Sequence, residues 1–367
     1  MIRSPFVLCS IIFAAVCSAC APSPPPPPPS PAAGGGRELG RQATCTRSDF
    51  QSKVSYLTDQ FTPGPVAALP LTSTTSPDGH DYAADLGDVF DAALSASGFQ
   101  DALCTLDAVY INTVSCHMPA ECFGNSWGWR QTLYRPATPN GRVVALSSDL
   151  WRKTYTTYET DLTRSILPPS GSGVTYSNAQ SCLPSGVCRP IDKLTTALLA
   201  ALAHEVAHIA WRVTVPFMDP TTFCGGNFFA QSWTTPIYWQ PWWRHLLTPD
   251  ERKSLRSIGG LPDVHKNPPY IDQIDNPGTG DPKQSIYDLL AATQPWASIF
   301  SAMSPDEDFV ETYKFKVLTT ANPPLTSVSI KVPGFDPRAD IVADYRNQDP
   351  GTKQDLKAKV GCVSLSF

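Results

Sequence analysis

The feature that most constrains the fold of this chain is an apolar stretch over residues 191–215. Leucine and β-branched residues recur there at helical spacing, with many alanines between them. Pro190 precedes the stretch and Pro216 follows it, and prolines at these places favour the start and the end of a helix. The sequence therefore predicts one long helix with an apolar stripe along it.

Two histidines and a glutamate interrupt this apolar pattern: His204, Glu205 and His208. Histidines four residues apart lie on one face of a helix, so both imidazoles can reach one ion. Surface histidines are the simpler alternative, but buried histidines without a partner would be costly in such an apolar helix. The spacing therefore predicts that His204 and His208 bind a zinc ion. Glu205 is then placed to hold a water molecule at the metal and to take its proton.

A catalytic zinc site of this kind needs a third protein ligand, with one tetrahedral position left open. In the metzincin pattern a glycine and a third histidine follow shortly afterwards, whereas this chain has Trp211 and Thr214 in those places. The third ligand must therefore come from further along the chain. The candidates are His245, Asp263, His265 and an acidic cluster over residues 306–311.

The acidic cluster is the favoured candidate, because Glu307 and Glu311 again lie four residues apart in a predicted helix. Ser304 is a good N-cap for that helix, Pro305 fits its first position, and Glu307 its third, as in a capping box. One glutamate can bind the metal while the other accepts a hydrogen bond from a ligand histidine. The alternative is an ordinary acidic helix start, which the helix dipole also favours.

The two motifs together resemble the gluzincins, zinc peptidases in which HExxH is followed on a later helix by E-x-x-x-D or E-x-x-x-E. The resemblance covers these two helices and the strand-then-helix order before them, and the segment between the motifs is longer here than in compact members. It implies that Glu307 is the third zinc ligand and that Glu311 accepts the hydrogen bond. It also implies a zincin-like fold of two lobes and the activity of a zinc metallopeptidase.

The first residues of the chain have the pattern of an export signal. Arg3 precedes a short apolar run and then small residues, which predicts a signal peptide over residues 1–21. Cleavage after an A-x-A sequence would release a secreted protein, whereas a lipobox at Cys17–Cys20 would lipidate Cys20 and anchor the protein to a membrane. Residues 22–44 are rich in proline and glycine and are predicted to form a disordered linker. Because a spacer suits a tethered protein, we favour a lipid-anchored protein of the cell envelope over a secreted one.

The cysteine content indicates an oxidising compartment. Three of the eleven cysteines lie in the predicted signal peptide, which leaves an even number in the rest of the chain. Cys116/Cys122 and Cys182/Cys188 each enclose a short loop and are the predicted disulfide pairs. No C-x-x-C motif follows the signal peptide, so a cysteine-bound zinc is not expected.

Beyond the linker, residues 45–367 are predicted to form one α+β metallopeptidase domain. Residues 45–215 supply a strand-rich N-terminal lobe that ends in the helix with the two histidines. Residues 216–303 form an aromatic-rich insertion, and residues 304–367 a mostly helical C-terminal lobe. Zinc is expected in the cleft between the lobes.

Local patterns place further elements in this domain. Apolar residues at helical spacing predict a helix over 82–97, and the region 102–167 is predicted to be rich in strands. The helix that begins at Ser304 is expected to reach about residue 318. The predicted strands cover residues 108–111, 142–146 and 325–332, and a closing helical stretch lies near Cys362.

Two further roles are expected at such a site. A histidine or tyrosine should donate a hydrogen bond to the developing oxyanion, and a peptide substrate should pair with an edge strand. Residues 142–146 or the region of Trp127 could supply that strand. The candidate donors to the oxyanion are His245, His265, Tyr270 and Tyr313.

The predicted function is that of a monomeric zinc-dependent endopeptidase acting on a peptide or protein substrate. The net charge is −5 and Lys and Arg do not cluster, so nucleic acid is not an expected partner. Two alternatives stay open. One is a zinc-binding envelope protein without proteolytic activity, and the other is a lipoprotein that binds a polysaccharide or another substrate through the aromatic segment 238–245.

Overall fold

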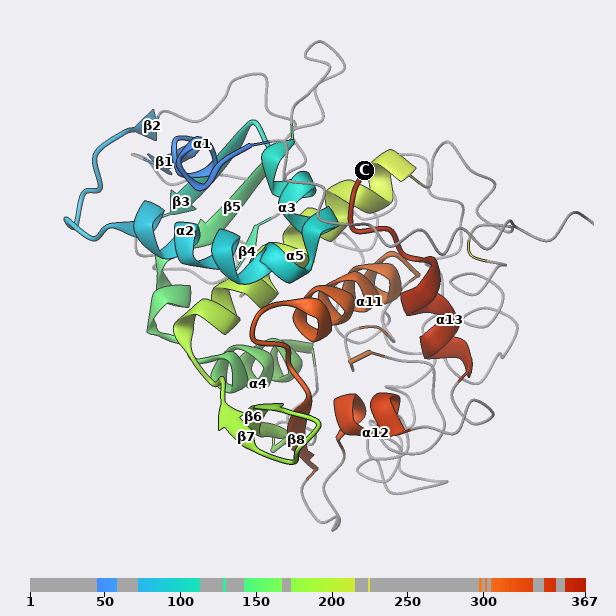
Figure 1. The fold of residues 1–367 in the computed structure, drawn as a ribbon. Helices are drawn as coiled ribbons and strands as arrows, with labels where there is room; N and C mark the ends of the chain where they lie inside the picture. The colour runs from blue at the N-terminus through green and yellow to red at the C-terminus, as the bar shows by residue number, and fades with distance from the viewer. Residues whose placement is uncertain are drawn as a thin grey trace, which may run out of the picture. The chain divides into compact units, whose positions relative to one another are not determined.

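A computed structural model describes residues 45–57, 72–112, 128–129, 142–166, 173–214, 224, 297–298, 301, 305–332, 340–347 and 354–367. Within these residues helices and strands are mixed along the chain, as the sequence predicts (Figure 1). The predicted signal peptide, the linker over 22–44 and nearly all of the insertion over 216–303 lie outside them. The arrangement in two lobes therefore stays a prediction.

The first sheet contains five of the described strands, in the order β2-β1-β3-β5-β4. β1, β3 and β5 run parallel, and β2 and β4 join them antiparallel at the two sides. β3 and β5 confirm the strands predicted at 108–111 and 142–146, and both are almost wholly buried, as inner parallel strands usually are. The bounds are Val54–Leu57 for β1, Thr72–Ser73 for β2, Ala108–Asn112 for β3, Gly128–Trp129 for β4 and Val143–Ser147 for β5, which the 3-10 helix η3 follows at Ser148–Arg152.

One short helix precedes β1 in the chain, and three further helical segments lie between β2 and β3. The helix predicted over 82–97 is confirmed in its first part as α2, which Asp81 caps by accepting a hydrogen bond from the backbone nitrogen of Ala84. The chain then forms a 3-10 turn and a separate helix. The bounds are Arg47–Gln51 for α1, Tyr82–Ala92 for α2, Ala93–Ser95 for η1 and Ser97–Cys104 for α3.

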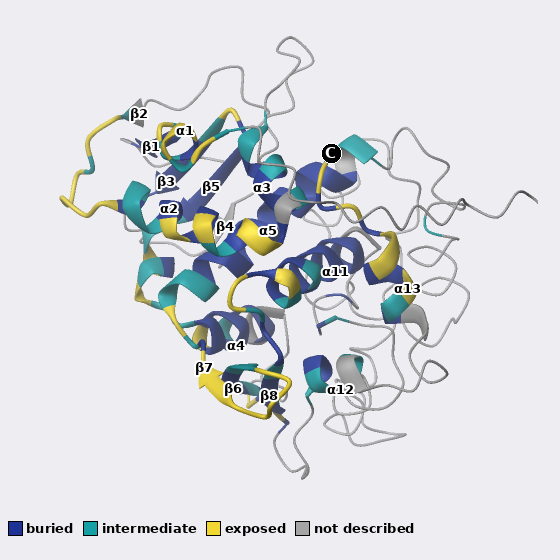
Figure 2. Ribbon diagram, in the orientation of Figure 1, coloured by how far each residue is buried: buried dark blue, intermediate teal, exposed yellow. Residues whose placement is uncertain are grey.

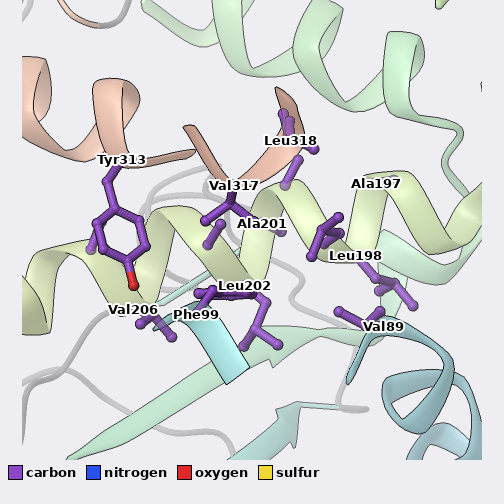
Figure 3. Packing of buried hydrophobic residues seen from close by; sticks show 14 of the residues in the cluster. Val89, Phe99, Ala197, Leu198, Ala201, Leu202, Val206, Tyr313, Val317 and Leu318 are labelled. Atoms are coloured by element: carbon purple, nitrogen blue, oxygen red, sulfur yellow. The ribbon is translucent and has the colours of Figure 1, made fainter. Parts of the chain in front are cut away.

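The predicted long helix is confirmed as α5, Leu194–Thr214, which runs through the core. Its part Leu194–Trp211 has the length and apolar composition to cross a membrane, but 83% of that part is buried inside the protein. Val89 of α2 and Phe99 of α3 pack beside its side chains (Figure 3). α5 is therefore covered by the fold around it.

The helix predicted from Ser304 onward is confirmed as α11, Pro305–Thr320, although Ser304 itself is outside the described residues. α11 lies alongside α5, and both helices are buried over most of their length (Figure 2). Val317 of α11 faces Ala201 of α5 across the interface (Figure 3). The alanines of α5 leave room for a close approach of the two helices, which brings their polar residues together.

Part of the β-rich prediction for residues 102–167 is wrong, because helix α4, Tyr155–Ile166, occupies the end of this region. α4 is rich in threonine and tyrosine, residues that favour strands. Tyr155, Tyr158 and Leu162 nevertheless recur at helical spacing and are buried. Burial of this helical face outweighs the local preference for a strand.

The second sheet has three described strands in the antiparallel order β7-β6-β8. β8 confirms the strand predicted at 325–332, whereas β6 and β7 were not predicted. α4 packs on β6, and a final helix confirms the helical stretch near Cys362. The bounds are Thr175–Cys182 for β6, Cys188–Pro190 for β7, Ser327–Lys331 for β8, Ile341–Asn347 for α12 and Gln354–Cys362 for α13.

Disulfides connect both neighbouring and distant parts of the described chain. Cys182–Cys188 joins β6 to β7 and confirms a predicted pair. Cys45–Cys104 and Cys224–Cys362 join residues 59 and 138 positions apart in the sequence. The other predicted pair, Cys116/Cys122, lies outside the described residues. Disulfides of this kind are typical of proteins in oxidising compartments.

Candidate metal centre

Helices α5 and α11 bring together three of the side chains that the sequence singles out: His204, His208 and Glu307. His204 and His208 lie one turn apart on α5, and Glu307 lies in the first turn of α11. One ligand atom from each residue lies within 4.8 Å of the other two, and all three side chains are buried. Such a group can hold a metal ion.

The donor atoms of this group face one another at short range. Nε2 of His204 and Nε2 of His208 are 3.3 Å apart. Glu307 approaches both rings, with Oε2 3.8 Å from Nε2 of His204 and Oε1 3.7 Å from Nε2 of His208. Two ring nitrogens and a carboxylate around one buried point favour a cation there.

Glu311 orients the first of these histidines. Its Oε1 accepts a hydrogen bond of 2.8 Å from Nδ1 of His204. An ionised carboxylate can only accept, so the ring proton lies on Nδ1 and the lone pair lies on Nε2, the atom nearest to His208 and Glu307. A carboxylate in this position raises the basicity of a ligand histidine and holds its ring in place.

The charges of the site act strongly on one another. Burial by itself lowers the pKa of His204, but the hydrogen bond to Glu311 and the charges of Glu307 and Glu205 outweigh it and raise that pKa. Burial by itself raises the pKa of Glu311, but Lys314 and His204 outweigh it and lower that pKa to about 2. Glu311 is therefore ionised at neutral pH and can act as the acceptor for His204.

Three residues that the sequence did not single out contact Glu311 or its neighbours. Oγ of Ser298 donates to Oε2 of Glu311 at 2.5 Å, and Nζ of Lys314 lies 2.8 Å from the same oxygen. Lys314 also lies 2.9 Å from Oε1 of Glu159, on α4. The spacing of three between Glu311 and Lys314 is a signal that could have suggested their pairing. Glu159 was hidden in a region predicted to form strands, and Ser298 carries no local signal.

Glu205 follows His204 on α5 and is buried with it. Its negative charge is among those that raise the pKa of His204. A carboxylate beside a metal site is chemically able to take and return a proton.

The structure removes some of the other candidates. Tyr313 is fully buried, and its hydroxyl donates to the backbone oxygen of Leu365 at 2.7 Å, so it is not available as a donor to an oxyanion. Asp308 of the acidic cluster pairs with Lys359 of α13, at 2.5 Å, instead of with the histidines. The remaining candidates lie outside the described residues: His245, Asp263, His265 and Tyr270.

Comparisons with protein-family models, with curated proteins and with solved structures find no match to this chain. The resemblance to the gluzincins therefore rests on the two sequence motifs. The chemistry of the site is inferred from its own residues and distances.

Proposed function

We propose that this chain is a zinc-dependent endopeptidase of the gluzincin type. In this proposal His204, His208 and Glu307 bind the zinc ion, and Glu205 is the catalytic base. The observation that carries the proposal is the convergence of these two imidazoles and one carboxylate from α5 and α11. The residues between the two motifs number about a hundred, so chain proximity does not explain the convergence.

The donor set and its distances support zinc. Zinc bonds to histidine nitrogen and carboxylate oxygen are about 2.0–2.2 Å long, so neighbouring donors around a tetrahedral ion lie about 3.3–3.6 Å apart. The two ring nitrogens, Nε2 of His204 and Nε2 of His208, are 3.3 Å apart, Oε2 of Glu307 lies 3.8 Å from the first, and its Oε1 lies 3.7 Å from the second, so each pair is close to this spacing. Three protein ligands also leave the fourth position open, as in catalytic zinc sites.

The charges around the site support a divalent cation as well. Among the described residues, four buried glutamates lie on α4, α5 and α11 around the site, and one lysine, Lys314, lies among them. Buried carboxylates in such excess are costly unless positive charge is added. A zinc ion would supply that charge. The four glutamates are Glu159, Glu205, Glu307 and Glu311.

In the proposed reaction the protein moves a proton beside the metal. Zinc, when bound, polarises the carbonyl of the peptide bond and acidifies a water molecule. Glu205 takes the proton from the attacking water and gives it to the nitrogen of the leaving amine. Glu311 keeps Nδ1 of His204 protonated, so that Nε2 of His204 stays a metal donor.

The sheet limits where a peptide substrate can bind. Residues 142–146 were expected as a candidate edge strand, but this is wrong because β5 has β3 on one side and β4 on the other. β4, Gly128–Trp129, is the last of the described strands on that side of the sheet, and it lies next to α5. We therefore place the substrate along β4, which begins directly after Trp127.

The proposed setting is the cell envelope or the exterior. The predicted signal peptide and the anchor at Cys20 support an exported protein, and the disulfides support an oxidising compartment. The peptide or protein substrates of the enzyme would then be found outside the cytoplasm.

The test is to compare the purified exported protein with its Glu205→Gln variant. Wild type should bind one zinc ion and cleave an unfolded protein substrate, and a chelator should abolish cleavage. Glu205→Gln should keep the zinc, because Glu205 is not a ligand, and should lose at least about 100-fold in cleavage rate, as expected for a general base. Asp88→Asn, a change at an exposed carboxylate on α2, is the control and should leave both properties unchanged.

Two outcomes would contradict the proposal. Zinc binding by wild type without any cleavage, over a range of unfolded substrates, would favour a zinc-binding envelope protein. A folded wild-type protein that binds no zinc would favour a binding lipoprotein in which the aromatic segment 238–245 carries the function.

A further inference from the structure

A continuous row of buried charged groups begins at Nδ1 of His204, the ring nitrogen that does not face His208 and Glu307. Nδ1 of His204 donates to Glu311, Glu311 contacts Lys314, and Lys314 contacts Glu159. Lys314 is 3% exposed and Glu159 is 2% exposed, so neither charge is solvated by bulk water. The row connects α5, α11 and α4.

The ammonium group of Lys314 is surrounded by partners. Nζ lies 2.8 Å from Oε2 of Glu311, 2.9 Å from Oε1 of Glu159 and 3.2 Å from Oε2 of Glu159. It also lies 5.8 Å from the centre of the Tyr158 ring, within the range of a cation–π contact. Well-packed apolar side chains would often stabilise a fold as well as such a buried ion pair. Its presence behind a ligand histidine therefore suggests a role in the site.

The two oxygens of Glu311 have different partners. Oε1 accepts from His204, whereas Oε2 accepts from Ser298 and Lys314. Rotation of the carboxylate away from His204 would break the contact with Lys314 as well. Lys314 in turn contacts Glu159 of α4, so the position of Glu311 depends on a residue of a third helix.

We propose that Lys314 and Glu159 are positioning residues of the metal site, which strengthen metal binding by holding Glu311 against His204. The inference rests on the proposed metal site. It does not depend on the proposed peptidase activity, since its readout is the binding of the metal. Lys314 supplies positive charge between two carboxylates, and Glu159 keeps that charge in place.

The experiment measures zinc affinity by competition with a chelator in the full exported protein and in single variants. Lys314→Met should weaken zinc binding by about 10–100-fold, the range found when groups behind metal ligands are removed. Lys314→Arg keeps the charge and should restore most of the affinity. Glu159→Gln keeps the shape of the side chain and should give a smaller loss than Lys314→Met.

A spectroscopic measurement separates positioning from general loss of stability. With cobalt(II) in place of zinc, Lys314→Met should alter the visible absorption bands, because the donor geometry at His204 changes. Lys359→Met is the matched control, since Lys359 lies on α13 and forms a different buried ion pair with α11, through Asp308. It should lower the thermal stability but leave the zinc affinity and the cobalt spectrum unchanged.

The outcomes distinguish this inference from the proposed function. If folded Lys314→Met binds zinc as tightly as wild type, or loses no more affinity than Lys359→Met, the inference is overturned and the proposed function stands. If Lys314→Met does not fold, Glu159→Gln decides in the same way. Wild type that binds zinc without cleaving peptides overturns the peptidase proposal only, and wild type that binds no zinc overturns both.

Discussion

Glu311 on α11 accepts a hydrogen bond of 2.8 Å from Nδ1 of His204 on α5, although 107 residues separate them in the sequence. The bond assigns the ring proton to Nδ1. Nε2, beside His208 and Glu307, then carries the lone pair that can bind a metal. One contact between two helices thus determines the chemical form in which His204 meets a metal. Changes at this contact should affect metal binding more than they affect the fold.

The first prediction concerns Glu311→Gln. The amide oxygen can still accept from His204, but the negative charge that raises the basicity of the imidazole is lost, and Lys314 loses one of its charged partners. Zinc affinity should fall about 10–100-fold. Chelator competition measures the change, and an affinity equal to that of wild type would show that Glu311 has no role at the metal.

The second prediction concerns Glu307→Ala. Removing the proposed third ligand leaves two histidines, so tight zinc binding should be lost, as determined by the metal content after dialysis. Asp308→Asn, one residue away, is the comparison, because Asp308 pairs with Lys359 and should not be a ligand. Retention of one tightly bound zinc by Glu307→Ala would transfer the role to another candidate, such as Asp263 or His265.

The third prediction concerns removal of the metal. Zinc that binds the folded protein but not the unfolded chain raises the free energy of unfolding by about 2.7 kcal/mol when its free concentration is 100 times Kd. The melting temperature should therefore rise with added zinc and fall with a chelator. In His208→Ala the melting temperature should not respond to zinc, and a response equal to that of wild type would place the ion elsewhere.

The fourth prediction compares two disulfides. Cys224–Cys362 encloses a loop of 138 residues and Cys182–Cys188 one of 6 residues. Because a longer closed loop restricts the unfolded chain more, replacing the first pair by alanines should cost about 4–5 kcal/mol and replacing the second about 2 kcal/mol. Chemical denaturation measures both, and a larger cost for Cys182–Cys188 would contradict the prediction.

Sequence patterns located most of the elements that carry the site. The helix with His204 and His208 and the helix with Glu307 and Glu311 are present at nearly the predicted bounds. Both have strong local signals, an apolar period with flanking prolines in one and a proline at the start in the other. The strands β3 and β5 were found for the same reason, since their apolar runs are bounded by turn-forming residues.

Other elements were missed where local preference and tertiary burial disagree. The threonines and tyrosines of α4 favour a strand. The segment forms a helix because Tyr155, Tyr158 and Leu162 share one helical face and are buried. This error concealed Glu159 as a partner of Lys314. Tyr313 was one of four candidate donors to the oxyanion, but its hydroxyl donates to the backbone oxygen of Leu365.

By itself the sequence determined which side chains share a helical face: His204 with His208, and Glu307 with Glu311. A spacing of four residues is enough for this, since the helix repeats every 3.6 residues. Only the tertiary structure decided that the two faces meet, that Glu311 contacts Nδ1 of His204, and that Lys314 is held by Glu159. These contacts join residues far apart in the chain, and they depend on how apolar surfaces pack, which no local pattern specifies.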